Sequence, residues 1–154
     1  HLFSAKLPNK KLYDEKKYFT PGKKACLTNL PWGKIGMTIC YDLRFPHLYR
    51  KLARKGADFI TVPSAFTKFT GEMHWHTLLK ARAIETGCFI FAPAQFGNHP
   101  EKKQTYGHTL IIDPWGKIIN ECNKNNSVII SEINRKKVSM MRTSIPSLKL
   151  EKKF

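Results

Sequence analysis

Alternating apolar and polar residues at 34–40 predict a half-buried strand, with isoleucine and methionine side chains on one face. The other face ends at Cys40, where the alternation stops. A polar, charged turn follows at 41–44, and Pro46 suits the first position of a helix because its missing N–H costs nothing there. Such a strand–turn–helix order would expose the Cys40 thiol at a sheet edge, as hydrolases of other folds present a nucleophile. A buried structural cysteine is the alternative, because free cysteine is among the most buried residue types.

Elsewhere the hydrophobic pattern predicts strands that alternate with helices. Short apolar runs bounded by turn residues are typical of strands, and apolar residues every three or four positions are typical of helices. The predicted strands cover 25–30, 34–40, 58–62, 88–92, 109–112, 117–120 and 128–133, the helices cover 46–55, 72–86 and 135–141, and long loops cover 64–71 and 93–106. We therefore expect an α/β protein with a mixed sheet in a layered sandwich.

The chain has 154 residues, which is one domain's worth. No apolar run approaches the roughly 18 residues of a membrane span, and no export leader follows His1. The four cysteines form no CxxC pair, which favours a reducing compartment, and we expect a cytoplasmic protein. Because the first residue is histidine and not methionine, we also expect the chain to be the tail of something longer.

The net charge of +16 raises the question of nucleic-acid binding. The basic residues are dispersed over turns and predicted helix ends, and no nucleic-acid-binding motif occurs among them. We therefore interpret them as a solvated surface and expect neither a nucleic-acid nor a membrane partner. The competing hypothesis, a basic nucleic-acid-binding module, predicts an affinity that falls steeply with salt.

Histidine spacing argues against a metal site. His74 and His76 are the closest pair, but residues two apart on a helix point away from each other, and the zinc-protease pattern needs a spacing of four. We expect no metal ion and no cofactor.

Four stretches together resemble the carbon–nitrogen hydrolase (nitrilase) superfamily. They are GMTICYDLRFPHLYR at 36–50, HW..LL.ARAIE at 74–85, YGHTLIIDPWG at 106–116 and HLF at 1–3. The resemblance implies an α-β-β-α sandwich with a mixed sheet. Residues 1–154 would be the C-terminal portion of that single domain, with the upstream part missing.

The resemblance also implies catalytic roles. Cys40 matches the family's nucleophile, and Glu15, which precedes a Pro-Gly turn, matches its second glutamate. The family's lysine and general-base glutamate would lie upstream of His1 and are absent from the sequence. Without the resemblance, Glu15 would be interpreted as a surface charge among lysines.

Substrate contacts follow from the same comparison. Beside the nucleophile, the backbone N–H of Tyr41 could stabilise an oxyanion. Arg44 could hold a substrate carboxylate with its two N–H groups, although an ion pair with Asp42 is an equal alternative. Phe66 and Thr70 resemble the family's pocket wall, although each could be ordinary loop packing.

The expected function is hydrolysis of an amide bond in a small carboxylate-bearing substrate through a cysteine thioester. The expected partner is that small-molecule amide, and a complete protein is expected to form a homo-oligomer. The alternative is a catalytically inactive remnant or one half of a split hydrolase. In the absence of the upstream part, we expect exposed apolar edges at 59–62 and 89–92.

Overall fold

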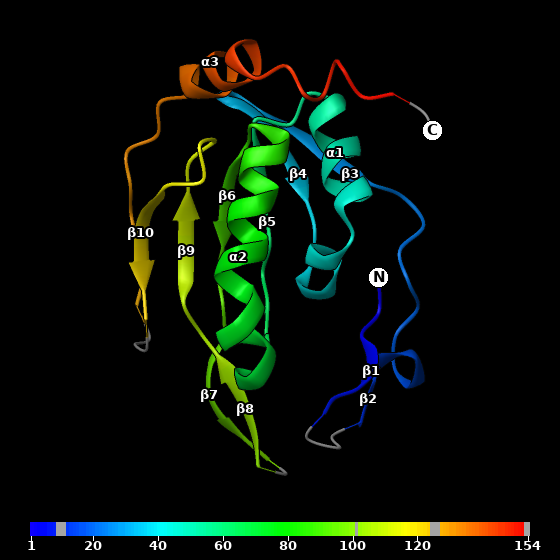
Figure 1. Cartoon of the computed structure of the whole chain (residues 1–154). Coiled ribbons are helices and arrows are strands. Elements are labelled where there is room, and N and C mark those ends of the chain that lie inside the picture. Colours follow the sequence, from blue (N-terminus) through cyan, green and yellow to red (C-terminus); the bar gives the residue numbers. More distant parts are fainter. Residues whose placement is uncertain (9–11, 101, 124–126, 153–154) are drawn as a thin grey trace.

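The computed structural model describes residues 1–8, 12–100, 102–123 and 127–152 and has a six-stranded sheet at its centre (Figure 1). The strands are β1 (Ser4–Lys6), β2 (Leu12–Asp14), β3 (Cys26–Leu30), β4 (Gly33–Met37), β5 (Phe59–Thr61), β6 (Phe89–Ala92), β7 (Phe96–His99), β8 (Lys103–Tyr106), β9 (Thr109–Ile112) and β10 (Ile118–Cys122). The helices are α1 (Pro46–Arg54), α2 (Lys68–Thr86) and α3 (Lys136–Ser144), with short 3-10 helices η1 (Glu15–Lys17) and η2 (Cys40–Arg44).

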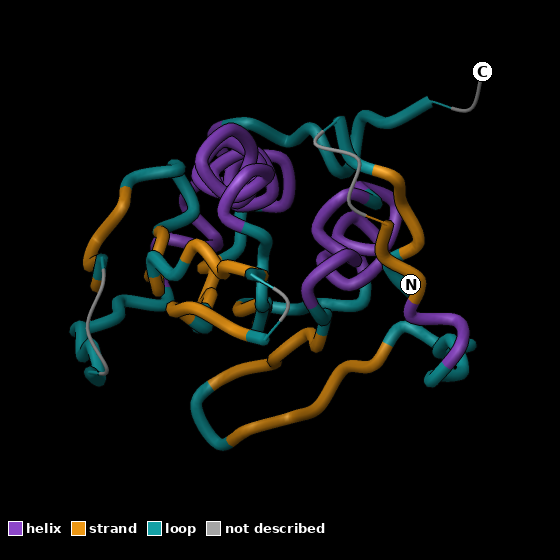
Figure 2. Tube along the Cα trace, turned by 90° about the horizontal axis from the view of Figure 1, so that it is seen from below, coloured by secondary structure: helices purple, strands orange, loops and turns teal. Residues whose placement is uncertain are grey.

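The main sheet is mixed and has the strand order β10-β9-β6-β5-β4-β3. Strands β4, β5 and β6 are parallel neighbours, and the remaining pairs are antiparallel. Helix α1 connects β4 to β5 and helix α2 connects β5 to β6, and both lie on the same face of the sheet (Figure 2). The predicted α/β class with a mixed sheet is therefore confirmed, as one helical layer over one sheet.

The core lies between the sheet and these two helices. Tyr49 and Leu52 of α1 and Trp75 and Leu79 of α2 are fully buried. At Gly36 in β4, an added Cβ would lie 3.1 Å from the Leu52 side chain, so glycine lets α1 pack closely on this strand. This packing fixes the end of β4 and the turn that follows it.

Strand β4 is shorter than the predicted strand over 34–40, and its apolar face is the more exposed one. Met37 is 46% exposed and Ile39 is 66% exposed, whereas Thr38 is buried and its hydroxyl donates to the Thr61 carbonyl (2.8 Å). The helices cover the small and polar face of the strand. The opposite face exposes Met37 and Ile39, whereas Ile35 on that face is half-buried against a second apolar cluster that includes Phe59 and Phe89.

Helix α2 begins earlier than predicted. The expectation of a loop over 64–71 is wrong for its second half, because Thr67 caps the helix and accepts a hydrogen bond on its Oγ1 atom from the Thr70 N–H (3.3 Å). Gly71 then lies in the first turn, where a Cβ would collide with the Tyr106 side chain. Glycine therefore allows α2 to start beside the β7–β8 hairpin.

Two further predictions are wrong. The predicted loop over 93–106 contains the antiparallel hairpin β7–β8, with Phe96 paired to Tyr106. The predicted strand over 128–133 forms no strand in the described part of the chain, and its Val128 and Ile130 side chains are almost fully exposed. β-Branched residues favour a strand only where a partner supplies hydrogen bonds and packing.

The expected exposed edges at 59–62 and 89–92 are also wrong. These residues belong to the central strands β5 and β6, and Phe59 and Phe89 are almost completely buried. Among the described residues, none of the helices is long and apolar enough to span a membrane.

Candidate active site

All six residues proposed from the sequence line one cavity at the carboxyl ends of β4 and β5. The cavity has a volume of about 120 Å³. Those six are Glu15, Cys40, Tyr41, Arg44, Phe66 and Thr70, and the remaining lining residues are Phe3, Tyr13, Ala65 and Thr67. The carboxyl ends of parallel strands are where open α/β sheets bind ligands. The fold thus brings together side chains from the N-terminal hairpin, the turn after β4 and the start of α2.

Cys40 lies at the point where β4 gives way to η2, in an unusual backbone conformation. Its φ angle is +45°, which costs about 1–3 kcal/mol for a residue other than glycine. The surroundings hold it there, because its N–H donates to the Pro63 carbonyl (3.0 Å) and Asp42 accepts from the Ile39 N–H (2.9 Å). Strain of this kind is concentrated at functional sites, and here it sets the direction of the thiol.

The thiol lies in a largely buried environment. Burial raises the pKa of Cys40 above its ordinary value, and the negative charge of Glu15 adds to the rise. The polar surroundings supplied by the backbone of Ala65 and Tyr41 and by the Ser64 side chain act in the opposite direction, but the pKa remains raised. The thiol is therefore protonated at neutral pH. The sequence analysis did not identify Ser64 or Ala65, which follow β5 and have no local signature.

This environment predicts how the rate of alkylation of the Cys40 thiol depends on pH. Because the pKa of Cys40 is raised, we expect its alkylation by iodoacetamide to develop with a midpoint above that of an ordinary cysteine, about 8.5. Peptide mapping by mass spectrometry over a pH series measures it, with the chain unfolded in denaturant as the reference. A midpoint below that of the unfolded chain would contradict the description, since it would require a positive charge beside the sulfur.

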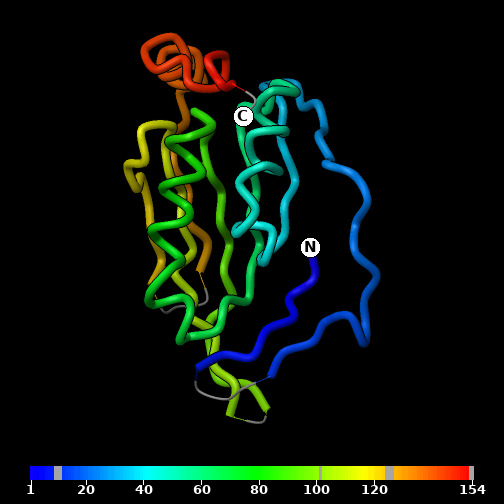
Figure 3. Tube along the Cα trace, turned by 45° about the vertical axis from the view of Figure 1, so that its right-hand side comes forward, coloured from blue at the N-terminus to red at the C-terminus, as the bar shows by residue number. Residues whose placement is uncertain are grey.

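Glu15 is half-buried and is part of the cavity wall, not a surface charge among lysines. Its carboxylate accepts a hydrogen bond from the Phe3 N–H (2.8 Å), and its own N–H donates to the Phe3 carbonyl (2.9 Å). These bonds join η1 to the N-terminal segment, which lies beside the turn containing Cys40 (Figure 3). There the His1 amino group contacts Asp42 (2.6 Å). The carboxylate is thus held near the thiol.

The Arg44 guanidinium lies against His74 and Phe66. Both terminal nitrogens of Arg44 are 3.3 Å from His74 Nδ1, and its central carbon is 5.4 Å from the centroid of the Phe66 ring. In the described part of the chain it forms no ion pair with Asp42, the alternative considered from the sequence, because Asp42 is engaged with the Ile39 N–H and His1. Arg44 is thus positioned at the cavity wall.

The remaining predicted residues have both packing and lining roles. Phe66 is 6% exposed and packs on Trp75, with ring centroids 4.8 Å apart. The Thr70 hydroxyl lies 2.9 Å from that of Thr67, at the N-terminus of α2. The Tyr41 ring packs on Phe3, with ring centroids 5.0 Å apart. The aromatic lining from Phe3 and Tyr13 was missed, because only the tertiary fold brings this hairpin to the cavity.

A cysteine held in a strained turn beside a carboxylate and a guanidinium is the kind of site that cysteine-dependent hydrolases use. Comparison with known proteins shows which hydrolase family the chain belongs to. Residues 1–143 match the carbon-nitrogen hydrolase family, and the chain belongs to it.

Similar proteins include curated amidases and solved structures. The chain is 45% identical over 150 residues to the deaminated glutathione amidase of Synechocystis, covering 96% of this chain and 55% of that protein. The human deaminated glutathione amidase is 40% identical over 147 residues, covering 95% of this chain and 45% of the relative. The chain thus spans about half the length of these relatives.

Among solved structures, the C. elegans NitFhit protein is similar, with a TM-score of 0.90 and 38% identity over 98% of this chain and 37% of that one. Nit3 of Saccharomyces cerevisiae, a member of the nitrilase superfamily, has a TM-score of 0.80 and 33% identity over 90% of this chain and 54% of that one.

Proposed function

We propose that this chain carries the cysteine-bearing portion of an amidase that hydrolyses an amide bond in a small carboxylate-bearing substrate. The observation that supports this most directly is that Cys40, Glu15 and Arg44 line one cavity although they come from separate parts of the chain. Family membership and the amidase names of the relatives favour the same reaction.

The proposed reaction has two halves. The Cys40 thiolate attacks the amide carbonyl carbon, and the tetrahedral oxyanion accepts a hydrogen bond from the Tyr41 N–H. The C–N bond breaks, and ammonia leaves with a proton supplied by a carboxylic acid. Water then attacks the thioester, a carboxylate takes its proton, and the carboxylic acid product leaves as the Cys40 sulfur recovers a proton. Splitting the reaction this way replaces one difficult step by two easier ones.

This chain supplies only part of that machinery. Among the described residues, Glu15 is the one carboxylate that lines the cavity, and none of the described lysines lines it. We propose that Glu15 positions and tunes a lysine that the sequence does not contain, while the general base also comes from outside the chain. A cation at that place would lower the thiol pKa that burial now raises.

The substrate class follows from Arg44. Among the described residues, the Arg44 guanidinium contacts the His74 ring and the Phe66 ring and forms no ion pair, so its charge is available for a carboxylate. The relatives are named for deaminated glutathione, which bears carboxylates, and we propose the same class of ligand here.

Replacing Arg44 with lysine should weaken this preference. The substitution keeps the charge but loses the planar pair of N–H donors, so the preference for a dicarboxylic monoamide over a neutral amide should fall by about 1–3 kcal/mol in kcat/KM. The assay uses the chain completed with an upstream segment, and Arg50→Lys is the matched control because Arg50 pairs with Glu151 away from the cavity (2.9 Å). An unchanged preference in Arg44→Lys would rule out this role.

The second candidate is an inactive remnant or one half of a split hydrolase. The raised pKa of Cys40 favours it, since such a thiol alone is a poor nucleophile at neutral pH. Ammonia release from a dicarboxylic monoamide is measured with the chain alone and with the chain completed. Activity in the completed chain alone supports an amidase that needs a further segment, and no activity in either supports the inactive remnant.

A further inference from the structure

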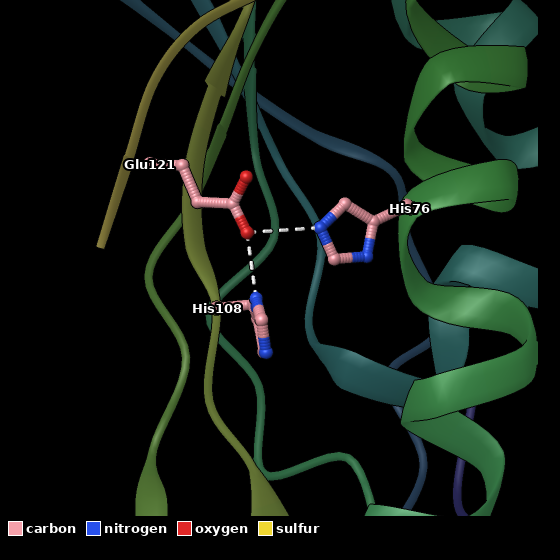
Figure 4. Close-up of side chains that lie close together, drawn as sticks. All are labelled: His76, His108 and Glu121. Atoms are coloured by element: carbon pink, nitrogen blue, oxygen red, sulfur yellow. Dashed lines mark hydrogen bonds and ion pairs between the residues drawn. The ribbon is translucent and has the colours of Figure 1, made fainter. Parts of the chain in front are cut away.

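Three potential metal ligands meet on the side of the molecule formed by α2, β9 and β10 (Figure 4). His76 projects from α2, His108 from the turn between β8 and β9, and Glu121 from β10. Glu121 Oε1 lies 3.1 Å from His76 Nε2 and 2.6 Å from His108 Nδ1, and all three ligand atoms lie within 4.8 Å of one another. None of these residues lines the cavity of Cys40.

The backbone around His108 holds this side chain in place. His108 has a φ angle of +61°, a left-handed conformation that is uncommon for a residue other than glycine. Its carbonyl accepts a hydrogen bond from the Trp75 indole N–H (2.8 Å), and its ring stacks on Tyr106, with centroids 4.1 Å apart. Because Trp75 is a buried residue of α2 next to His76, the same anchor sets the positions of both histidines.

The third residue is held by the sheet. Glu121 pairs with Leu110 across the antiparallel β9–β10 ladder, so its side chain rises from a fixed backbone position. The exposed fraction of the side chain is 26% for Glu121, 28% for His76 and 16% for His108. An ion could therefore reach the three groups from solvent without opening the core.

We propose that His76, His108 and Glu121 form a binding site for one divalent ion of the zinc or cobalt type. Two imidazole nitrogens and one carboxylate oxygen are a donor set that zinc uses when a fourth position stays open for water. Imidazole suits zinc, cobalt, nickel and copper, whereas magnesium and calcium prefer oxygen ligands, so the site should discriminate against the last two.

The geometry needs only small side-chain movements. Donor atoms about 2.0–2.2 Å from one zinc ion lie roughly 3–4 Å apart in a tetrahedral arrangement. The contact between Glu121 and His76 already has this spacing, and that between Glu121 and His108 must lengthen by turning side chains. An ion would replace the shared hydrogen bonds of Glu121.

Without an ion, the same three groups form a hydrogen-bonded network around the Glu121 carboxylate. The experiment below distinguishes this network from a metal site.

The sequence-based expectation of no metal site compared only His74 with His76, and on α2 these point in different directions. His76 instead meets two residues far away in the sequence, which spacing along the chain does not reveal.

The test is a titration of the chain with Co²⁺, followed by its visible d–d absorption, and with Zn²⁺, followed by calorimetry. It is carried out on the chain alone and on the chain completed with an upstream segment. We expect one saturable ion per chain that excess Mg²⁺ does not displace. His76→Ala, His108→Ala and Glu121→Gln should each weaken binding by at least about tenfold.

Glu121→Gln is the most informative variant, because an amide keeps the size and hydrogen bonds of the side chain but loses the anionic ligand. Near-UV circular dichroism checks that each variant keeps its fold. His99→Ala and His1→Ala are controls, and both should bind the ion normally. His1→Ala is included because the terminal amine and imidazole of His1 could chelate a metal ion by themselves. The proposal is overturned by the absence of stoichiometric binding, by binding that survives Glu121→Gln and His108→Ala, or by binding that is lost in His1→Ala.

Discussion

Replacing Cys40 with alanine should abolish amide hydrolysis in the chain completed with an upstream segment taken from a relative. Removing a nucleophile takes away the covalent route itself, so we expect kcat to fall by a factor on the order of 10⁴ or more. The fold should survive, because the hydrogen bonds that define the turn run from the Cys40 N–H to the Pro63 carbonyl and from the Ile39 N–H to Asp42, and neither uses the thiol. Ammonia release from a dicarboxylic monoamide gives the rate, and circular dichroism checks the fold.

A second cysteine supplies the control for this substitution. Cys26 is exposed at the start of β3 and lies outside the cavity, so Cys26→Ala should leave the rate unchanged. Cys88 is less suitable, because its buried thiol donates to the Ala57 carbonyl (3.2 Å) and accepts from Arg142 (3.0 Å), and its loss would disturb packing. Turnover by Cys40→Ala comparable to that of Cys26→Ala would disprove the assignment of the nucleophile.

The second large effect concerns the 154-residue chain by itself, which should show no measurable amidase activity. Two physical reasons converge on this result. The pKa of Cys40 is raised by burial, so little thiolate is present at neutral pH. In addition, Glu15 is held by the Phe3 N–H, and no other carboxylate among the described residues reaches the cavity to act as general base.

The sheet gives a further reason to expect dependence on another segment. Met37 and Ile39 on the face away from the helices are exposed, and Trp32 in the preceding turn is 54% exposed. Apolar surface of this kind favours association. We therefore expect the isolated chain to be marginally stable or prone to aggregate.

Adding the missing segment tests the expected lack of activity and the expected low stability of the isolated chain together. The part of the Synechocystis relative that this chain does not match, joined in one polypeptide or added as a second chain, should raise both the unfolding temperature and the rate of ammonia release. The same complex made with Cys40→Ala separates stabilisation from catalysis, because its unfolding temperature should rise while it releases no ammonia. Robust turnover by the 154 residues alone would show that the proposed catalytic set is incorrect.

The hydrophobic pattern by itself determined most of the core elements. Helix α1 ends where Gly56 adopts a φ angle of +93°, and helix α2 ends at Gly87 in a left-handed conformation, as their sequences predict. The apolar runs of β5 and β6 become the central strands because each is buried on both faces. These are local signals, since periodicity and the special conformations of glycine depend on neighbouring residues alone.

The early start of α2 had a local signal that the prediction did not use. Thr67 is a favourable N-cap, and a cap search would have placed the helix start correctly. By contrast, the failure at 128–133 has no local signal, because its apolar residues would need a strand partner that only the fold can supply.

The candidate site divides in the same way. The sequence by itself determined that Cys40 follows a strand and precedes a helix, and the family resemblance indicated Glu15 and Arg44. Only the tertiary structure decided that Arg44 contacts His74 and not Asp42. It also decided that burial raises the thiol pKa, since exposure depends on elements distant in the sequence.

The cluster of His76, His108 and Glu121 shows most clearly what the sequence pattern cannot predict. Its members come from a helix, a turn and a strand, and no spacing rule relates them. They meet because α2 packs across β9 and because Trp75 binds the His108 carbonyl. Local periodicity therefore determines which elements form, while the long-range packing of those elements decides which polar side chains become neighbours.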